Sequence, residues 1–282
     1  MNDQEIHRVV ELALAEDIGS GDVTTLATVP ETALAAAVMR AREPLVAAGL
    51  RLAQAAFTQL SPKVRITIPV EDGRSAGAGG VLMRITGPAR ALLSAERVAL
   101  NFVQRLSGVA TLTAQFVEAV KGTHAQILDT RKTTPGWRRL EKHAVICGGG
   151  RNHRLGLFDM VLIKDNHLEA LRDEPPNAIA AALQRARAAW PQLKIEVEAD
   201  TLEQVEQAVA AGADLILLDN MNLGQLRLAV QKAKGHAQTE ASGGVTLASV
   251  RAIAETGVDF ISVGALTHSA RAVDIGLDFE GR

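Results

Sequence analysis

The chain has 282 residues, 47% of them hydrophobic and 22% charged, which is typical of a globular protein with one large domain or two smaller ones. Its formal net charge of −2 excludes the extended basic fields of nucleic-acid coats and membrane-surface proteins, so any anion must be bound locally. The single cysteine, Cys147, excludes an intramolecular disulfide and a cysteine-based zinc site.

The N-terminal segment "MNDQEIHRVV" lacks the cationic and apolar regions of a signal peptide. No apolar run approaches the roughly 18–20 residues that a membrane-spanning helix needs. We therefore expect a cytoplasmic protein with neither a membrane nor a nucleic acid as its partner.

The first 105 residues or so mix helical and extended patterns. Apolar residues at helical spacing predict helices, and alternating or β-rich runs between turn residues predict strands. The predicted helices are 3–17, 49–60 and 89–120, the last with a break at Gly108, and the predicted strands are 33–41, 63–70 and 80–87.

From Gln126 onward short apolar runs alternate with helical segments. The runs are "AQILD", "MVLIK", "KIEVE", "LILLD", "AQTEAS" and "FISVG", and helices are predicted over 177–190, 201–212, 223–235 and 246–257. Such alternation indicates parallel βα units. A complete eight-unit barrel needs roughly 200–250 residues, so a barrel here would be short or supplemented by helices from the front. A doubly wound open sheet is the alternative.

Almost every predicted strand ends in a residue suited to chemistry. These residues are Asp129 with Arg131, then Lys164, Glu198, Asp219, Ser242 and Gly264. The carboxyl ends of parallel barrel strands converge on one face, where active sites form. A polar residue after any one strand is unremarkable, but six in succession favour a barrel with a site at that face.

Lysine and arginine residues gather between Asp129 and His167. Arg131 and Lys132 directly follow a strand, His153 and Arg154 follow a glycine loop, and Lys164 ends an apolar strand. Guanidinium groups grip carboxylates in bidentate fashion and ammonium groups suit phosphates, so the set predicts a ligand with several negative charges. Three further cations are expected to form only the solvated face of a helix starting near Pro135, namely Arg138, Arg139 and Lys142.

Glycine-rich turns occur in three places. "GGG" at 148–150 is compatible either with a helix cap and turn or with close approach of the backbone to a ligand. Ser242, Gly243 and Gly244 follow one late strand, and Gly264 follows the next. Consecutive turns of this kind after the last barrel strands predict a cradle for the 5′-phosphate of a sugar phosphate.

Glu198 and Asp219 are the acidic counterparts, and strand alternation places Glu196 on the same face as Glu198. A carboxylate on a buried strand needs a partner, which Lys164, Lys132 or a magnesium-loaded ligand would supply. An internal salt-bridge network is the alternative. No motif spacing suggests a metal held by the protein, and no P-loop or dinucleotide-binding motif follows a strand.

Several motifs together resemble the quinolinate phosphoribosyltransferase family over nearly the whole chain. They are "EDIGSGDVTT", "AERVALNFVQRLSG", "LDTRKTTPG", "EKHAVICGGGRNHRLGLFDMVLIKDNH", "IEVE", "LILLDN", "EASGGVT" and "GVDFISVGALTHSA". His143, where family members often have an aromatic residue, and Trp137, where they have leucine, depart from the pattern. The resemblance implies an N-terminal α/β sandwich domain, 1–105, with which the tail 271–282 is free to pack. It implies an incomplete, about six-stranded parallel α/β barrel over 106–270.

The same resemblance implies transfer of phosphoribosyl from PRPP to quinolinate with decarboxylation, Mg²⁺ accompanying PRPP, and a homodimer whose subunits share each active site. Whether dimers assemble further is left open. The residues implied to bind substrate are Arg97 from the neighbouring subunit, Thr130, Arg131, His153 and Arg154, with Ser242, Gly243, Gly244 and Gly264 at the 5′-phosphate. The implied catalytic residues are Lys132, Lys164, Glu198 and Asp219, the last two facing the ribose and the magnesium–pyrophosphate region.

Three other functions are compatible with parts of the pattern. A nicotinate phosphoribosyltransferase would use PRPP but release no CO₂. A sugar-phosphate isomerase or lyase would explain the late glycine turns but leave Arg131, Lys132 and Arg154 without a second anion. A non-catalytic phosphosugar-binding or regulatory protein would bind without turnover.

Overall fold

A computed structural model describes residues 1–280 and divides the chain into two compact units. Unit 1 comprises Met1–Ala114, Thr134–Gly149 and the C-terminal stretch from Ser269, and unit 2 comprises Gln115–Thr133 and Gly150–His268. The sequence places one boundary near residue 105 and treats 106–270 as continuous. In the structure, the segment Thr134–Gly149 belongs to unit 1, so the chain leaves unit 1 and re-enters it before unit 2 is complete.

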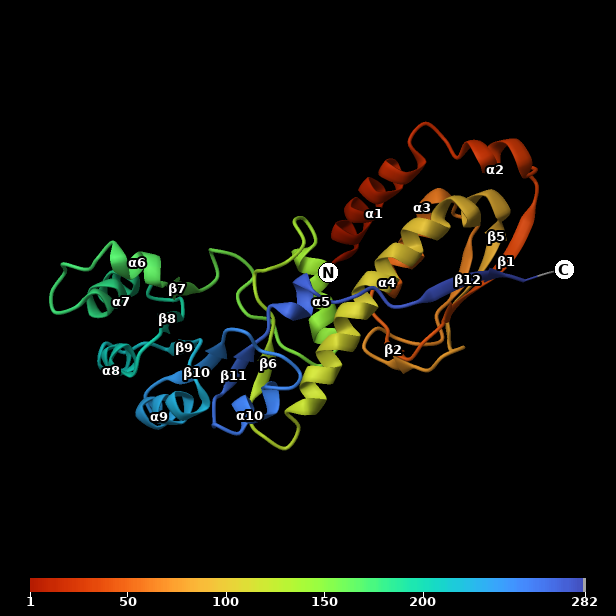
Figure 1. Ribbon diagram of the computed structural model, residues 1–282. Helices are drawn as coiled ribbons and strands as arrows, with labels where there is room; N and C mark the ends of the chain where they lie inside the picture. The colour runs from red at the N-terminus through yellow and green to blue at the C-terminus, as the bar shows by residue number, and fades with distance from the viewer. Residues whose placement is uncertain (281–282) are drawn as a thin grey trace. The chain divides into compact units, whose positions relative to one another are not determined.

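Unit 1 is built on a mainly antiparallel sheet with strand order β12-β1-β5-β3 (Figure 1). The strands are β1 (Leu34–Ala41), β3 (Arg65–Thr67), β5 (Val81–Pro88) and β12 (Ile275–Phe279), with a small second sheet of β2 (Leu45–Val46) and β4 (Ser75–Ala76). The C-terminal strand β12 thus lies beside the first strand of the chain, with Met39 opposite Leu277.

Five helices of the described chain belong wholly or largely to unit 1. They are α1 (Asp3–Ile18), α2 (Val23–Thr28), α3 (Leu50–Leu60), α4 (Ala89–Ala119) and α5 (Arg138–Cys147). A capping box fixes the start of α1, because Asn2 accepts from the Glu5 amide at 2.9 Å and Glu5 accepts from the Asn2 amide. The helices predicted over 3–17 and 49–60 are confirmed, and α5 begins three residues after Pro135.

Helix α4 runs without interruption, so the predicted break at Gly108 is wrong. Glycine has another reason to be there. A Cβ built on Gly108 would lie 1.9 Å from the carbonyl oxygen of Arg271, in the segment that leads into β12. Only a residue without a side chain lets that segment cross the helix so closely.

Replacing Gly108 by alanine should therefore destabilise the protein by about 3 kcal/mol, because backbone atoms must move to admit the methyl group. Thermal unfolding measures the effect. Gly77→Ala is the matched control, since a Cβ at Gly77 meets nothing within 4 Å. Equal melting temperatures for the two variants would contradict the proposed crossing.

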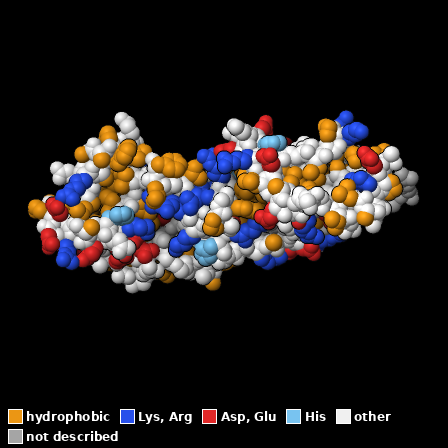
Figure 2. Space-filling model, turned by 90° about the horizontal axis from the view of Figure 1, so that it is seen from above, with side chains coloured by type: hydrophobic (Ala, Val, Ile, Leu, Met, Phe, Trp, Pro, Cys, Tyr) orange, Lys and Arg blue, Asp and Glu red, His pale blue; other side chains and the backbone are white. Residues whose placement is uncertain are grey.

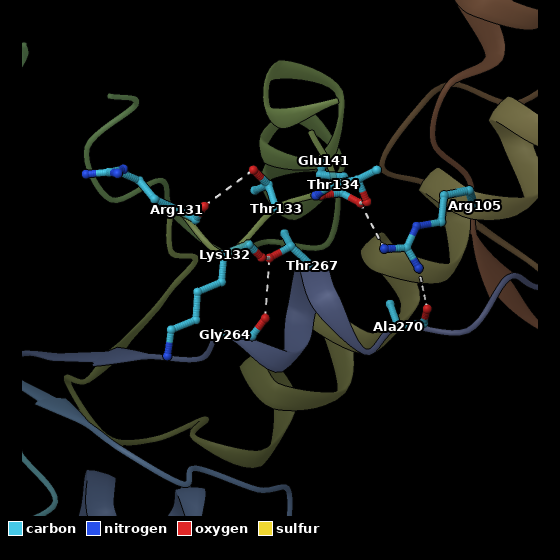
Figure 3. Close-up of polar contacts among 9 residues, drawn as sticks. All are labelled: Arg105, Arg131, Lys132, Thr133, Thr134, Glu141, Gly264, Thr267 and Ala270. Atoms are coloured by element: carbon cyan, nitrogen blue, oxygen red, sulfur yellow. Dashed lines mark hydrogen bonds and ion pairs between the residues drawn. The ribbon is translucent and has the colours of Figure 1, made fainter. Parts of the chain in front are cut away.

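Buried polar contacts explain why the segment Thr134–Gly149 joins unit 1 (Figure 3). Glu141 is fully buried and accepts hydrogen bonds from Arg105 Nη2 at 2.8 Å and from the Thr134 amide at 3.0 Å. Trp137 stacks on Phe102, with ring centroids 5.2 Å apart. A buried carboxylate with charged and neutral donors holds the segment against α4.

The predicted solvated face of this helix is partly wrong. Arg139 is exposed and pairs with Glu5, whereas the side chain of Lys142 is only 2% exposed. The helical pattern alone could not distinguish these positions, because burial depends on which face α5 packs against α4. Gly148 belongs to the same contact, since a Cβ there would lie 2.4 Å from the Ala110 carbonyl oxygen. The adjacent Gly149 has a φ of +84°, so both glycines serve packing and turning.

The described residues of unit 2 contain a six-stranded parallel sheet with strand order β6-β11-β10-β9-β8-β7 (Figure 1). The strands are β6 (Gln126–Leu128), β7 (Val161–Ile163), β8 (Ile195–Ala199), β9 (Leu215–Asp219), β10 (Gln238–Ser242) and β11 (Phe260–Ser262). Strands β7 to β11 are neighbours in chain order, and the first strand pairs with the last. A doubly wound sheet would reverse this order, so the fold is an incomplete barrel, as predicted.

Helices follow the strands of this sheet. They are α6 (Asp165–Glu169), α7 (Ala178–Ala189), α8 (Leu202–Ala210), α9 (Leu223–Ala233), α10 (Val250–Ala254) and α11 (Ala265–His268). Side chains at their N-caps start three of them: Asn177, Thr201 and Asn222 each accept from the amide three residues on. Each of the helices α7 to α10 packs on at least one of the two strands that it connects.

Across residues 1–280, every helix is too short or too polar to cross a lipid bilayer. The face shown in Figure 2 carries basic, acidic and hydrophobic side chains in separate small groups. That face therefore presents no continuous basic field, in agreement with the near-neutral charge of the chain.

Candidate active site

A cavity of about 370 Å³ lies in unit 2, among residues at or just beyond the carboxyl ends of the barrel strands. Its walls carry both signs of charge, and Leu162 and Leu217 add apolar surface. The lining residues are Thr130, Arg131, Lys132, His153, Arg154, Leu162, Lys164, Glu198, Leu217, Asp219, Glu240, Ser242 and Ser262.

Two loops bring basic residues to this cavity. The loop after β6 is anchored by the Thr267 hydroxyl, which donates to the Lys132 carbonyl at 2.7 Å (Figure 3). The Lys132 amide also donates to Thr130 Oγ1 at 3.0 Å. The second loop is tied to the first strand, because the amide of His153 donates to the buried Asp129 carboxylate at 2.8 Å. Arg131–Lys132 and His153–Arg154 therefore reach one cavity from separate parts of the chain.

Lys164 and Glu198 form an ion pair in the cavity wall. Nζ of Lys164 lies 2.6 Å from Oε2 of Glu198, and the two side chains are 45% and 11% exposed. The pair joins the ends of the neighbouring strands β7 and β8. The sequence left open whether Glu198 pairs with Lys164, Lys132 or a ligand, and the structure selects Lys164.

His153 is held by two carboxyl groups and a backbone amide. Its Nε2 lies 3.0 Å from Glu196 Oε2 and 3.5 Å from Glu240 Oε2, while its Nδ1 accepts from the Arg154 amide at 2.7 Å. Because Nδ1 accepts a hydrogen bond, the ring proton resides on Nε2 and faces the two carboxyls. Both ring nitrogens therefore face groups of the protein, in a side chain that is 8% exposed and lines the cavity.

Glu196 and Glu240 are both fully buried, on the interior strands β8 and β10, which lie on either side of β9. Burial raises the pKa of Glu196 to about 7, against the lowering effect of Arg154. Burial, followed by the charge of Glu196, raises the pKa of Glu240 to about 8. Near neutral pH the pair thus retains at least one proton, which limits the negative charge beneath a cavity rich in cations.

Burial also acts on the cations. Desolvation, and then the charge of Arg131, lowers the pKa of the Arg154 guanidinium. Arginine remains protonated in proteins, so Arg154 keeps its positive charge. Because this charge is poorly hydrated, it can bind an anion at little cost in lost hydration. The guanidinium groups of Arg131 and Arg154 repel each other. A ligand with two adjacent carboxylates would relieve that repulsion by pairing with both.

The other side of the cavity is formed by the ends of β9 and β10. Asn220 Nδ2 donates to Asp219 Oδ2 at 2.7 Å, and a Cβ on Gly243 would lie 2.1 Å from Asn220 Oδ1. Gly243 also has a φ of +97°, so glycine is required there for both space and conformation. The turn after Ser242 thereby keeps its backbone close to the cavity.

The predicted site residues can now be placed. Those lining the cavity are Thr130, Arg131, Lys132, His153, Arg154, Lys164, Glu198, Asp219 and Ser242. Gly243 and Gly244 continue the turn after Ser242, and a Cβ on Gly264 would lie 3.3 Å from Lys132 Cδ. Arg97 is exposed on α4 in unit 1.

Sequence reasoning missed Glu240 and Ser262. Glu240 lies two residues before Ser242, so the alternation that paired Glu196 with Glu198 places Glu240 on the inner face as well. That signal was available but unused. Ser262 ends the short strand β11, where the prediction selected Gly264 instead.

Family models match almost the whole chain. The model described as quinolinate phosphoribosyl transferase, N-terminal domain, matches residues 22–107, and the corresponding C-terminal domain model matches residues 109–278. The chain belongs to the quinolinate phosphoribosyltransferase family. This confirms the family predicted from the sequence motifs.

Similar proteins bear names from this family. The chain is 46% identical to a nicotinate-nucleotide pyrophosphorylase [carboxylating] of Mycobacterium leprae, with 95% of each chain covered. It is 42% identical to a probable enzyme of the same name from Bacillus subtilis, covering 99% of this chain and 94% of the relative. The solved nicotinate-nucleotide pyrophosphorylase of Francisella tularensis superposes with a TM-score of 0.93 at 39% identity, covering 99% and 98%.

Proposed function

We propose that this protein is a pentosyltransferase that transfers phosphoribosyl from PRPP to quinolinate and releases pyrophosphate and CO₂, yielding nicotinate mononucleotide. The observation that carries this function is the convergence of Arg131, Lys132, Arg154 and Lys164 on one cavity beside the Ser242 turn. Quinolinate has two adjacent carboxylates, and PRPP has a 5′-phosphate and a pyrophosphate. These ligands need many cations but no protein nucleophile.

Arg131 and Arg154 are proposed to hold the quinolinate carboxylates, since their guanidinium groups provide planar donor forks. The backbone of Ser242, Gly243 and Gly244 is proposed to bind the 5′-phosphate, with Gly264 near Lys132 completing the cradle. Glu198 and Asp219 are left to accept hydrogen bonds from ribose hydroxyls. In this arrangement, cationic side chains surround the pyridine carboxylates and anionic side chains face the ribose, within one cavity.

The pyridine nitrogen would attack C1 of PRPP as the bond to pyrophosphate breaks, through a transition state with oxocarbenium character. Lys132 and Lys164 would stabilise the negative charge that develops on the leaving group. Glu198 and Asp219 would offset the positive charge at C1. When the C2 carboxylate then leaves as CO₂, the electron pair of the broken C–C bond stays on C2, where the adjacent positive nitrogen stabilises it, and protonation of C2 completes the reaction.

Mg²⁺ fits this site as a companion of PRPP. Glu198 is already paired with Lys164 and Asp219 with Asn220, so their carboxylates suit hydrogen bonds to the waters of an ion carried by the substrate. When bound, Mg²⁺ supplies charge neutralisation on the pyrophosphate.

One assay tests the reaction directly. Purified protein is mixed with Mg²⁺, quinolinate and PRPP, and we expect pyrophosphate and CO₂ in equal amounts. Nicotinate in place of quinolinate is the comparison, because a nicotinate phosphoribosyltransferase would release pyrophosphate alone. Binding of PRPP without any turnover would instead favour a phosphosugar-binding protein.

The active site is further proposed to be shared within a homodimer, with Arg97 of the partner subunit reaching quinolinate. The support for this proposal is that Arg97 is exposed on α4 and belongs to unit 1, whereas every residue lining the cavity belongs to unit 2.

Mixed dimers test the shared site. Arg97→Ala and Lys164→Ala homodimers should each be nearly inactive, whereas random mixing of the two chains should restore about a quarter of the wild-type activity, because half of the dimers contain one intact site. Activity is measured after co-expression with two affinity tags, and mixed dimers purified through both tags should show about half of the wild-type activity, because one of their two sites is intact. Absence of any recovery in purified mixed dimers would contradict sharing, and an Arg97→Ala chain with normal activity would remove Arg97 from the site.

A further inference from the structure

Three potential metal ligands meet in unit 1, among residues that the proposed reaction does not use. His143 and Cys147 lie one turn apart on α5, so both side chains leave the same face of the helix. Asp72 comes from the loop between β3 and β4. One donor atom from each residue lies within 4.8 Å of the other two.

The two distances from His143 to the other donor atoms match a tetrahedral zinc site. Nε2 of His143 lies 3.2 Å from Asp72 Oδ2 and 3.5 Å from Cys147 Sγ. Zinc bonds of about 2.0 Å to nitrogen, 2.1 Å to oxygen and 2.3 Å to sulfur at tetrahedral angles require about 3.3 Å between N and O and about 3.5 Å between N and S. The three side chains could therefore hold Zn²⁺ with little movement.

The same imidazole nitrogen faces both other donors, which argues against a catalytic triad. A Cys–His–Asp triad uses one ring nitrogen for the thiol and the other for the carboxylate. In this cluster Nε2 approaches both Asp72 and Cys147. Two other donor atoms gathered at one imidazole nitrogen fit a shared metal ion better than a triad.

Asp72 is fixed before any ligand arrives. Its two oxygens accept from the backbone amides of Gly49 and Leu50, both at 3.0 Å, at the start of α3. Gly73, with a φ of +86°, turns the loop next to Cys147, whose carbonyl oxygen is 3.4 Å from the Cβ position. A carboxylate held in this way loses little conformational freedom when it binds a metal.

The cluster is also accessible. The side chains of His143 and Asp72 are 33% and 17% exposed, and both line a cavity of about 270 Å³. Cys147 does not line this cavity, so the water that completes a four-coordinate site would enter from the side of His143 and Asp72. A thiolate and an imidazole favour Zn²⁺ over Mg²⁺ or Ca²⁺, which prefer oxygen ligands.

We propose that Asp72, His143 and Cys147 form a Zn²⁺-binding site with a water as the fourth ligand. The sequence-based exclusion of a cysteine-containing zinc site does not cover it, because one cysteine suffices when histidine and aspartate supply the other ligands. The site joins the loop before β4 to α5, so Zn²⁺ would crosslink two segments of unit 1 that are distant in the sequence. It is independent of the proposed reaction, because none of its residues lines the cavity in unit 2.

The experiment uses the full chain, stripped with a chelator and titrated with Zn²⁺ against an indicator dye. Because Zn²⁺ binds the neutral imidazole and the thiolate, the titration is run at pH 8, where their protons are displaced more easily than at lower pH. We expect one Zn²⁺ per chain. Cys147 is the only thiol, so Zn²⁺ should also slow its reaction with Ellman's reagent, whereas Mg²⁺ should not.

Two variants decide the assignment. His143→Phe and Cys147→Ser should each weaken Zn²⁺ binding by at least about 100-fold, whereas the exposed His236→Phe should leave it unchanged. Circular dichroism checks folding, and Cys147→Ser alone decides the matter if His143→Phe fails to fold. Absence of stoichiometric Zn²⁺ binding, or undiminished binding by folded Cys147→Ser, would overturn the proposal.

Discussion

Replacing Lys164 by alanine is expected to lower turnover by about 10²- to 10³-fold while the protein remains folded. The ammonium lies in the cavity wall, 2.6 Å from Glu198, where it can meet negative charge that develops on the leaving pyrophosphate. Arg131→Ala should cause a loss of similar size, because the cavity then lacks one donor for the quinolinate carboxylates. Steady-state release of pyrophosphate measures both variants.

The control for Lys164→Ala is Lys234→Ala, which removes an exposed lysine of unit 2 that does not line the cavity. Its turnover should equal that of the wild type. Thermal unfolding separates a chemical defect from a folding defect, since Lys164 is 45% exposed and its loss removes little packing. Near-wild-type turnover by folded Lys164→Ala would remove this residue from the mechanism.

The barrel was largely predictable because its signals are local. The apolar run "LILLD" becomes β9, and each regular alternation of run and helix specifies one βα unit. The parallel arrangement then places Lys164, Glu198 and Asp219 at one end without further information. The partner of Glu198 was left open by the sequence, because Lys132 and Lys164 both lie within reach of that end.

The errors concern contacts between segments distant in the sequence. Gly108 resembles a helix break until Arg271 is seen to cross it, and Lys142 resembles a surface residue until α5 packs with its face inward. The Asp72–His143–Cys147 cluster was missed for the same reason. Its helical pair is visible at i and i+4, but Asp72 is 71 positions from His143 and only the fold brings it near.

Glu240→Gln is expected to make the protein more stable than the wild type at alkaline pH. The folded-state pKa of Glu240 is raised to about 8 from an ordinary 4.5, chiefly by burial. The folded protein therefore holds a proton that the unfolded chain has released between pH 4.5 and 8, so wild-type stability falls as pH rises through this window. Glutamine keeps the shape of the protonated side chain and cannot ionise.

The gain at pH 8 should be roughly 3 kcal/mol, because the shift of Glu240 is large but its proton is coupled to that of Glu196. Melting temperatures between pH 5.5 and 8.5 measure it, with Glu203→Gln on the exposed face of α8 as the control. The wild type should lose stability across this range and the variant much less. Parallel pH curves for the two proteins would show that Glu240 does not carry the proton.

The same substitution links stability to substrate binding. Ionisation of Glu240 places a negative charge beside His153 and in the wall of a cavity that must hold carboxylates and phosphates. The KM for quinolinate should therefore rise above pH 8 in the wild type and stay flatter in Glu240→Gln, while kcat at pH 7 changes little. Glu240 stays protonated beneath the anion site because desolvation disfavours the carboxylate more strongly than neighbouring positive charge favours it. The floor of the cavity therefore adds no negative charge that would repel the substrates.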